Sequence, residues 1–439
     1  MTVPPTQPPP PTRRSSWVPV PEGSPFPVQN LPYGVFSRPG EPARVGVAIG
    51  DQVLDLGSAA ADGLLTVPEG EPGGDSGPPP HPTVDPAWFA QPALNAFLAA
   101  GRPAWRWARA RLTTMLCDPS YRDAVTPHLL PRAAIRSHLP WRVADYVDFY
   151  SSLHHATNIG RIFRPEAEPL SPNWRYLPVG YHGRAGTVVV SGTPVTRPNG
   201  QRKAAGEPAP TFGPSQRLDI EAEVGFVVGT PSRLGVPVPT GAVHEHVFGA
   251  VLVNDWSARD IQAWEYDPLG PFLGKSFATS VSPWVVPLDA LEAARVEVPE
   301  QAPPPLPYLA GGRRWGLDLQ LEVSLNGHVV ARPPFAGMYW TFAHQLAHLT
   351  VNGASLRTGD LFASGTVSGP QRHERGSLIE LTWNGRDPLE LPDGSCRTFL
   401  HDHDTVSITA SAAGPADTRL GFGEVYGTVR PAPRVPSGE

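Results

Sequence analysis

The sequence predicts a mainly β, α+β protein with two domains, and its length, proline content and apolar pattern all support this. The chain has 439 residues, which is more than one small core accommodates and enough for two domains. It contains 56 prolines, about 13% of the chain against a usual ~5%, which favours irregular connections between short strands over long helices. Apolar residues alternate over short segments such as residues 317–325, as they do in strands with one face on a core.

The N-terminal part is predicted to contain a leader and a small barrel-like unit. Residues 1–30 are rich in proline, lack the apolar segment of a secretory signal and are expected to form a disordered leader. Residues 33–56 are predicted to form short strands that turn at Gly50 and Asp51. Residues 69–82 are rich in proline, glycine and acidic residues, which indicates a surface insertion or linker.

Two helices are expected to close this first unit. Residues 92–100 and 103–116 each begin with a proline, which suits the first turn of a helix, and both have helical apolar spacing. A domain boundary is expected near His138.

The second part is expected to consist mainly of strands. Residues 247–253 form a nearly continuous apolar run, which predicts a strand buried on both faces. Residues 317–325 and 377–383 are expected to be strands that turn at the Asn-Gly pairs 326–327 and 384–385. Within this part, only residues 338–350 have a clear helical pattern.

Composition argues against several classes of function. The net charge of −6 and the pI of about 6.2 leave no basic surface for nucleic acid. No apolar run approaches the ~20 residues that span a membrane, so no membrane partner is expected and the cytoplasm is the default location. The two cysteines, Cys117 and Cys396, are too few for a disulfide framework and lack the spacing of a zinc-thiolate site.

A row of acids in the stretch LDIEAEVGFVVG, residues 218–229, points to a cation. If this stretch is one strand, Asp219, Glu221 and Glu223 share a face opposite a core stripe, with no basic residue among them to offset their repulsion. Two carboxylates about 7 Å apart on a strand can converge on one cation. The alternative is a solvated strand face, and the pattern alone does not decide between the two.

Two further acids extend this hypothesis. Asp255 follows the buried strand predicted at residues 247–253, where an acid either binds a ligand or caps the next segment. Asp148 lies in the segment DYVDFYSS. Carboxylates without thiolates favour a hard cation such as Ca²⁺ or Mg²⁺ over zinc.

Donors downstream of Asp255 are candidates for stabilising a negative charge. Arg259 and Gln262 share a face if their segment is helical, and Tyr266 lies one turn further. Lys275 is one of two lysines in the chain and lies in GPFLGKS, whose spacing is wrong for a phosphate-binding loop. It is interpreted as a fixed cation beside a site, and the alternative is a surface lysine.

A histidine and a glutamate are candidates for a general base and its partner. His155 follows Asp148 closely, and a single histidine is often only structural. Glu380 is the one charged residue of the apolar segment 377–383 and would be buried without a partner. A buried carboxylate and a histidine can satisfy each other and form the pair that a general base requires.

Long motifs give the chain a specific resemblance. The segments DYVDFYSSLHHATNIGRIFR, PNWRYLPVGYHGRAGTVVVSGTPV, VLVNDWSARDIQAWEYDPLGPFLGKSF, SPWVVPLDAL, ASGTVSGP and LGFGEVYGTV resemble the fumarylacetoacetate hydrolase family from about residue 31 to about residue 431. The resemblance implies a small SH3-like N-terminal barrel at residues 31–138 and a larger C-terminal mixed β-sandwich roll at residues 139–432. It also implies a homodimer formed through the larger domain.

The resemblance assigns roles by motif. It implies calcium ligands and a magnesium site that Asp255 faces near Lys275 and Thr279, with Asp219 as a bystander. His155 matches the general base and Glu380 the carboxylate that orients it, while Arg259, Gln262 and Lys275 would stabilise an oxyanion. The expected calcium ligands are Asp148, Glu221, Glu223 and Asp255, and the expected substrate-contacting residues are Tyr150, Arg164, Tyr181, Gln262, Tyr266 and Thr366.

The activity implied by the family is metal-dependent hydrolysis of a carbon–carbon bond in a small diketo acid. The expected reaction converts 4-fumarylacetoacetate into fumarate and acetoacetate, at the end of tyrosine and phenylalanine degradation. One alternative is a hydrolase, decarboxylase or isomerase of the same superfamily acting on another oxo or diketo acid. An alternative of another class is a non-catalytic scaffold stabilised by calcium.

Overall fold

The computed structural model describes residues 15–66, 84–204, 206–311 and 315–434, so most of the expected leader and the insertion at residues 69–82 lie outside the described residues. Residues 15–30 are ordered, which corrects the expectation of a disordered leader up to residue 30. Val18 and Phe26 are buried, and the indole of Trp17 donates to the carbonyl of Met115. The apolar side chains among the prolines supply the contacts that hold this segment in place.

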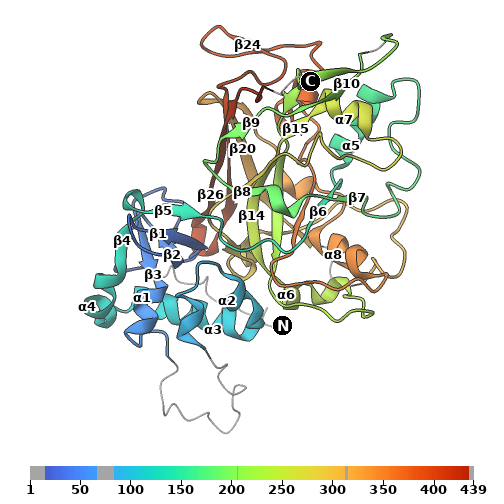
Figure 1. Ribbon diagram of the computed structural model, residues 1–439. Coiled ribbons are helices and arrows are strands. Elements are labelled where there is room, and N and C mark those ends of the chain that lie inside the picture. Colours follow the sequence, from blue (N-terminus) through green and yellow to red (C-terminus); the bar gives the residue numbers. More distant parts are fainter. Residues whose placement is uncertain (1–14, 67–83, 205, 312–314, 435–439) are drawn as a thin grey trace, which may run out of the picture.

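The N-terminal domain is a small sheet covered by short helices, seen at the lower left of Figure 1. Its antiparallel sheet has the order β4-β3-β2-β1-β5, and the expected turn at Gly50 lies between β2 and β3. The expected helical pair is present as α2 and α3. The strands are β1 (Tyr33–Ser37), β2 (Arg44–Ile49), β3 (Gln52–Asp55), β4 (Leu129–Pro131) and β5 (Arg136–His138), and the helices are α1 (Leu56–Ala61), α2 (Asn95–Ala99), α3 (Gly101–Cys117) and α4 (Arg122–Val125).

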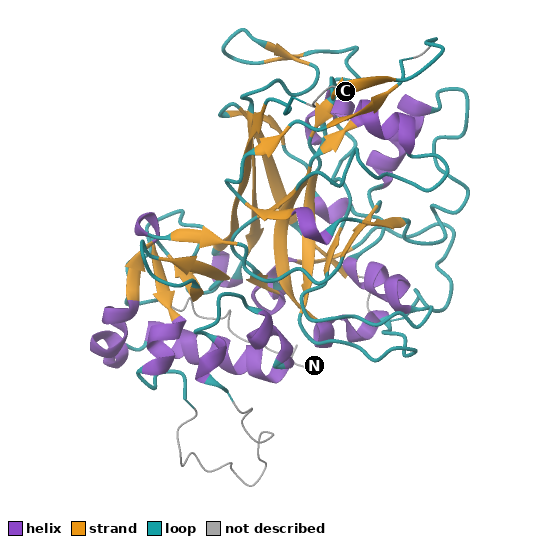
Figure 2. Ribbon diagram, viewed as in Figure 1, coloured by secondary structure: helices purple, strands orange, loops and turns teal. Residues whose placement is uncertain are grey.

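The C-terminal domain contains two large sheets (Figure 2). An eight-stranded sheet has the order β7-β6-β22-β13-β14-β16-β8, with β17 also paired to β14. Its strands are β6 (Tyr146–Phe149), β7 (Gly180–His182), β8 (Val188–Val190), β13 (Ala222–Val228), β14 (Val247–Asp255), β16 (Thr279–Val281), β17 (Val286–Pro287) and β22 (Leu361–Ala363).

The second large sheet has five strands in the order β21-β20-β25-β26-β9. The hairpin between β20 and β21 turns at Asn326 and Gly327, whose φ values of 52° and 81° are those that an Asn-Gly turn needs, so this prediction is confirmed. The strands are β9 (Val195–Thr196), β20 (Leu319–Leu325), β21 (His328–Ala331), β25 (Thr405–Ala413) and β26 (Arg419–Arg430).

Four two-stranded sheets complete the strands of the described ranges. They pair β10 (Asn199–Arg202) with β11 (Thr211–Pro214), β12 (Leu218–Asp219) with β15 (Ser257–Ala258), β18 (Arg295–Glu297) with β19 (Trp315–Leu317), and β23 (Leu389–Glu390) with β24 (Cys396–Arg397).

Strand β14 separates two hydrophobic cores, which explains its continuous apolar sequence. Ala250 and Leu252 point into the core shared with the five-stranded sheet. Val251 and Val253 point to the opposite face and join the core of the N-terminal domain. Alternate residues of a strand lie on opposite faces, so a strand covered on both sides needs apolar residues throughout. The central sheet is therefore fixed from both sides, and it carries the site described below.

Helices of the C-terminal domain differ in part from the expectation. The predicted helix at residues 338–350 is present as α8 (Phe342–Thr350), capped by Thr341. The prediction of a strand at residues 377–383 is wrong, because these residues form α9 (Leu378–Leu381) and then a turn with positive φ at Trp383. The remaining α-helices of the described ranges are α5 (Leu153–Phe163), α6 (Val243–His246) and α7 (Arg259–Glu265). In the described part of the chain no helix is long and apolar enough to cross a membrane.

Candidate active site

Four buried carboxylates meet at one edge of the eight-stranded sheet, where β6 and β14 end and β13 begins. Asp148 lies on β6, Glu223 on β13 and Asp255 at the end of β14, and Glu221 directly precedes β13. One ligand atom from each of the four lies within 4.8 Å of those of the others. The predicted cluster is therefore present as a geometric unit.

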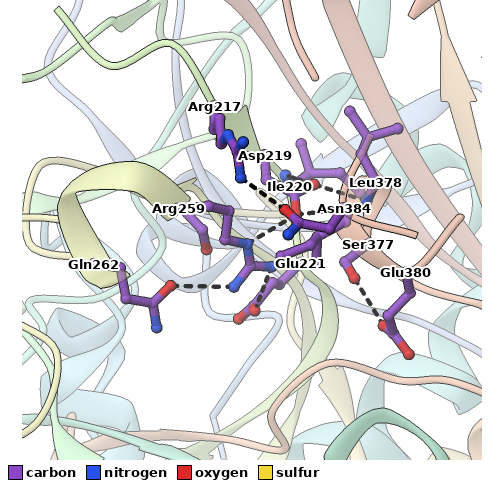
Figure 3. Close-up of polar contacts among 12 residues, drawn as sticks. Arg217, Asp219, Ile220, Glu221, Arg259, Gln262, Ser377, Leu378, Glu380 and Asn384 are labelled. Atoms are coloured by element: carbon purple, nitrogen blue, oxygen red, sulfur yellow. Dashed lines mark hydrogen bonds and ion pairs between the residues drawn. The ribbon is translucent and has the colours of Figure 1, made fainter. Parts of the chain in front are cut away.

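The stretch at residues 218–229 is not one continuous strand, which corrects the expectation that its three acids share a face. It consists of β12 and β13 with a break at Ile220 and Glu221. Asp219 consequently lies away from the cluster and bonds to Arg259 (Figure 3).

Two cations from other segments offset part of the repulsion in the cluster. The Glu221 carboxylate lies 2.5 Å from Nζ of Lys275 and 2.7 Å from Nη2 of Arg259. The Lys275 ammonium also bonds to Asp255 at 2.6 Å. Burial alone would raise the pKa of Glu221, but Lys275 and Arg259 outweigh burial and hold this pKa well below its ordinary value.

Asp148 and Glu223, the other two carboxylates of the cluster, lack such cationic partners among the described residues. Oδ1 of Asp148 and both carboxylate oxygens of Glu223 are buried and accept no hydrogen bond from the described residues. Burial, followed by the neighbouring carboxylates, raises the pKa of Glu223 and of Asp148 well above the ordinary values. Unpaired buried oxygens of this kind fit a hard divalent cation, which removes both the desolvation cost and the repulsion.

Cation binding is expected to release protons, because the raised pKa values favour protonated Asp148 and Glu223 whereas cation ligands must be ionised. A carboxyl whose pKa is higher in the folded than in the unfolded state stabilises the fold at low pH. This contribution is lost as the pH rises through the folded pKa. Added cation is therefore expected to raise the melting temperature more at neutral than at acid pH. Titration calorimetry in buffers of different ionisation enthalpy measures the released protons, and a buffer-independent enthalpy would contradict this expectation.

The expected magnesium site meets a constraint at Lys275. Burial lowers the pKa of Lys275, but Asp255 and Glu221 outweigh burial and raise it overall, so the side chain is an ammonium with no free electron pair. Oγ1 of Thr279 lies 3.1 Å from the second oxygen of Asp255, as a candidate ligand would. If Lys275 takes part in binding magnesium, it therefore does so through its backbone and not through its side chain.

His155 and Glu380 form the predicted pair. Ser152 caps α5 by accepting a hydrogen bond from the backbone of His155, which places the imidazole at the start of the helix. Nδ1 of His155 lies 2.7 Å from Oε2 of Glu380, and both side chains are buried. Since Glu380 holds Nδ1, the other ring nitrogen remains for chemistry, and it lies 3.9 Å from Glu221.

Three residues that the sequence analysis did not identify hold Glu380 in place. Its carboxylate accepts hydrogen bonds from Asn158, Ser368 and Ser377 in addition to His155. Burial would raise the pKa of Glu380, but His155, Asn158 and Ser377 lower it overall, which favours the ionised carboxylate. The spacing Ser377-x-x-Glu380 before apolar residues is a helix-start pattern and offered a signal for α9.

A cavity of about 380 Å³ connects the cluster with the His155–Glu380 pair. Thr366 lines this cavity, and its Oγ1 is buried without a hydrogen-bond partner in the described residues. A ligand in the cavity could supply that partner. Glu223 and Glu380 do not line this cavity, and Asp255 and Thr279 line a second cavity of about 120 Å³ instead. The predicted site residues that line the cavity are Asp148, Tyr150, His155, Arg164, Tyr181, Glu221, Arg259, Gln262, Tyr266, Lys275 and Thr366.

A strand-rich fold with a histidine–glutamate pair beside a cluster of four buried carboxylates, two of which lack a partner among the described residues, fits a hydrolytic enzyme. Comparison with known proteins identifies it more closely. Residues 29–140 match the family described as fumarylacetoacetase N-terminal, and residues 146–430 match the one described as fumarylacetoacetate (FAA) hydrolase C-terminal. The chain therefore belongs to the fumarylacetoacetate hydrolase family.

Similar proteins span nearly the whole chain. The chain is 48% identical over 429 residues to fumarylacetoacetase of Homo sapiens, which covers 95% of this chain and 99% of that protein. It is 45% identical over 436 residues to fumarylacetoacetase of Arabidopsis thaliana, with the same coverage. These relatives establish that the chain is a hydrolase.

Solved structures support the fold. Fumarylacetoacetate hydrolase from Exiguobacterium antarcticum matches with a TM-score of 0.53 at 17% identity, covering 91% of this chain and 99% of that chain. This likeness confirms the predicted fold class, a strand-rich mixture of sheet and helix.

Proposed function

We propose that the protein hydrolyses the carbon–carbon bond of 4-fumarylacetoacetate to fumarate and acetoacetate, as the last step of tyrosine and phenylalanine degradation. The observation that carries this proposal is the 2.7 Å contact between His155 and Glu380 beside unpaired buried carboxylates in the same cavity. The full-length similarity to fumarylacetoacetases supports the choice of substrate.

The cation is proposed to be Ca²⁺ held by Asp148, Glu221, Glu223 and Asp255, because all four offer oxygen ligands. Mg²⁺ is proposed as a second ion near Asp255 and Thr279. When bound, the cation supplies a Lewis acid that polarises a carbonyl of the diketone.

His155 is proposed as the general base. With Nδ1 held by Glu380, its Nε2 takes a proton from water, and the hydroxyl group adds to the carbonyl carbon next to the fumaryl group. The bond between this carbon and the methylene carbon of the acetoacetyl part then breaks. The bonding electrons pass to the methylene carbon, and the proton that His155 took from water passes to this carbon to give acetoacetate and to restore the base.

Neighbouring side chains are proposed to stabilise the negative charge that develops. The guanidinium of Arg259 donates to Oε1 of Gln262 at 3.2 Å, which leaves the amide NH₂ group of Gln262 as a donor for the cavity. The Lys275 ammonium adds a fixed positive charge beside the cluster.

The remaining polar residues of the wall are proposed to hold the substrate. Arg164 suits a terminal carboxylate because a guanidinium binds a carboxylate in a bidentate manner. Hydroxyl donors complete the binding surface and come from Tyr150, Tyr266 and Thr366, whereas the hydroxyl of Tyr181 donates to Asp255 at 3.0 Å and is proposed to accept a hydrogen bond from the substrate.

A homodimer formed through the C-terminal domain, a cytoplasmic location and domain limits at residues 31–138 and 139–432 belong to the same proposal. They are supported by the family resemblance, and the limits agree with the matched ranges 29–140 and 146–430.

The test is the loss of ultraviolet absorbance of 4-fumarylacetoacetate with the purified, calcium-loaded protein. Other oxo and diketo acids are assayed in parallel for hydrolysis, decarboxylation and isomerisation. The proposal expects the highest kcat/KM for fumarylacetoacetate. Preference for another acid would make that acid the substrate and would replace fumarylacetoacetate in the proposal. Inactivity with all of the acids would favour a non-catalytic scaffold.

A further inference from the structure

Asp219 joins three segments of the chain although it faces neither the cavity nor the carboxylate cluster. It has no solvent exposure. Its Oδ1 accepts the backbone N–H groups of Ile220 and Leu378, each at 2.7 Å. Its Oδ2 accepts the backbone N–H group of Ile379 at 3.0 Å and Nε of Arg259 at 2.8 Å (Figure 3). Four donors thus saturate one buried carboxylate.

The donors belong to the two halves of the proposed machinery. Leu378 and Ile379 form the first turn of α9, and Glu380 is the next residue. Arg259 begins α7, and its guanidinium also contacts Glu221 and Gln262. The Asp219 carboxylate therefore fixes the helix that carries the partner of His155 and the arginine beside the expected oxyanion.

The backbone reinforces this connection. Strand β12 pairs Asp219 with Ser257, two residues before Arg259. The backbone N–H group of Arg259 also donates to the carbonyl of Arg217 at 2.9 Å. The start of α7 is thus fixed to the Asp219 segment by main-chain bonds, and the side chain of Asp219 extends the connection to α9.

We propose that Asp219 is a positioning residue that sets Glu380 and Arg259 relative to each other, and this proposal rests on the proposed function. Catalytic groups displaced by about 1 Å can cost roughly 10²-fold in rate. A single rigid acceptor shared by both groups prevents their independent movement. No other residue type supplies four acceptor directions in so small a volume without adding a donor.

The variant Asp219→Asn tests this role. It keeps the size of the side chain, but its NH₂ group must face N–H donors on one side, which displaces α9 or Arg259. We expect kcat to fall roughly 10²-fold while KM changes less than about fivefold, because the substrate-binding wall is retained.

Asp404→Asn is the matched control. Asp404 is also buried, and it accepts hydrogen bonds from Nε and Nη2 of Arg397, from Asn326 and from the backbone of His401. It lines neither the cavity nor the cluster. We expect this variant to lower the melting temperature and to leave kcat within about twofold.

A second variant covers the case in which Asp219→Asn does not fold. Asp219→Glu keeps the charge that Arg259 needs and moves it by one methylene group, so kcat should fall at least about tenfold in a folded protein. If a folded Asp219 variant keeps kcat within about twofold at a reduced melting temperature, the residue is only structural and the proposal is wrong.

A measurement without substrate separates this proposal from the proposed function. The NMR resonance of the His155 Nδ1 proton, assigned with His155→Gln, reports the hydrogen bond to Glu380. We expect it to shift or broaden in Asp219→Asn and Asp219→Glu and to stay unchanged in Asp404→Asn. An unchanged resonance in the Asp219 variants would overturn the coupling, whichever acid the wild-type protein cleaves.

Discussion

Removal of the divalent cation is expected to lower turnover of fumarylacetoacetate by about 10³-fold or more, and added Ca²⁺ should restore it. A Lewis acid contributes several kcal/mol to such a reaction, and ~1.4 kcal/mol corresponds to a tenfold change in rate. The unpaired oxygens of Glu223 and Asp148 should also repel each other in the ionised, cation-free protein, so the melting temperature should fall as well.

The variant Glu223→Gln tests the same site without a chelator. It keeps the shape of a side chain that has no hydrogen-bond partner among the described residues and removes one ligand charge. We expect calcium affinity to fall by at least about tenfold and turnover at limiting calcium to fall with it. Calcium titrations followed by calorimetry and by the absorbance assay measure both effects. Full turnover by chelated wild-type protein would rule out the catalytic role of the cation.

Replacement of the base has an effect of similar size. His155→Ala is expected to reduce kcat by about 10²- to 10⁴-fold, because Nε2 no longer accepts the proton of the attacking water. Glu380→Gln is expected to lower kcat comparably, because an amide in place of the carboxylate can present a donor to Nδ1 and favour the wrong tautomer.

The neighbouring histidine supplies the control for these two variants. His154 is half-buried next to His155 and does not line the cavity, so His154→Gln should leave kcat nearly unchanged. Calcium affinity should be retained in His155→Ala, since His155 is not a ligand. Wild-type turnover by His155→Ala would contradict the assignment of the base and would require another group to activate the water.

The sequence predicted the parts of the site that depend on residue type and local spacing. Glu221 and Glu223 were recognisable because two acids on a short apolar segment are costly without a partner. Asp255 was recognisable because it ends β14, whose apolar sequence reflects cores on both faces. The long family motifs then supplied the proposed roles of these residues and of His155.

Relationships between distant segments could not be predicted in the same way. Asp219 was expected to be a bystander because the resemblance gives it no ligand role. Its partners could not be predicted, since they lie 40 residues away at Arg259 and 159 residues away at Leu378. The contact of Glu380 with His155 was expected, but with Glu380 in a strand instead of α9. A segment of four residues, three of them apolar, fits a strand or a helix equally well. The helix is favoured by the carboxylate of Asp219, which accepts backbone N–H groups of α9 and comes from another part of the chain.

The most direct test of the account is hydrolysis of fumarylacetoacetate in H₂¹⁸O by the calcium-loaded protein, with the fumarate analysed by mass spectrometry. Water activated by His155 and added to the carbonyl next to the fumaryl group must leave one of its oxygens in the new carboxylate of fumarate. The account predicts that every fumarate molecule formed carries at least one ¹⁸O atom and that its formation depends on the cation. Unlabelled fumarate, or no fumarate at all, would contradict it.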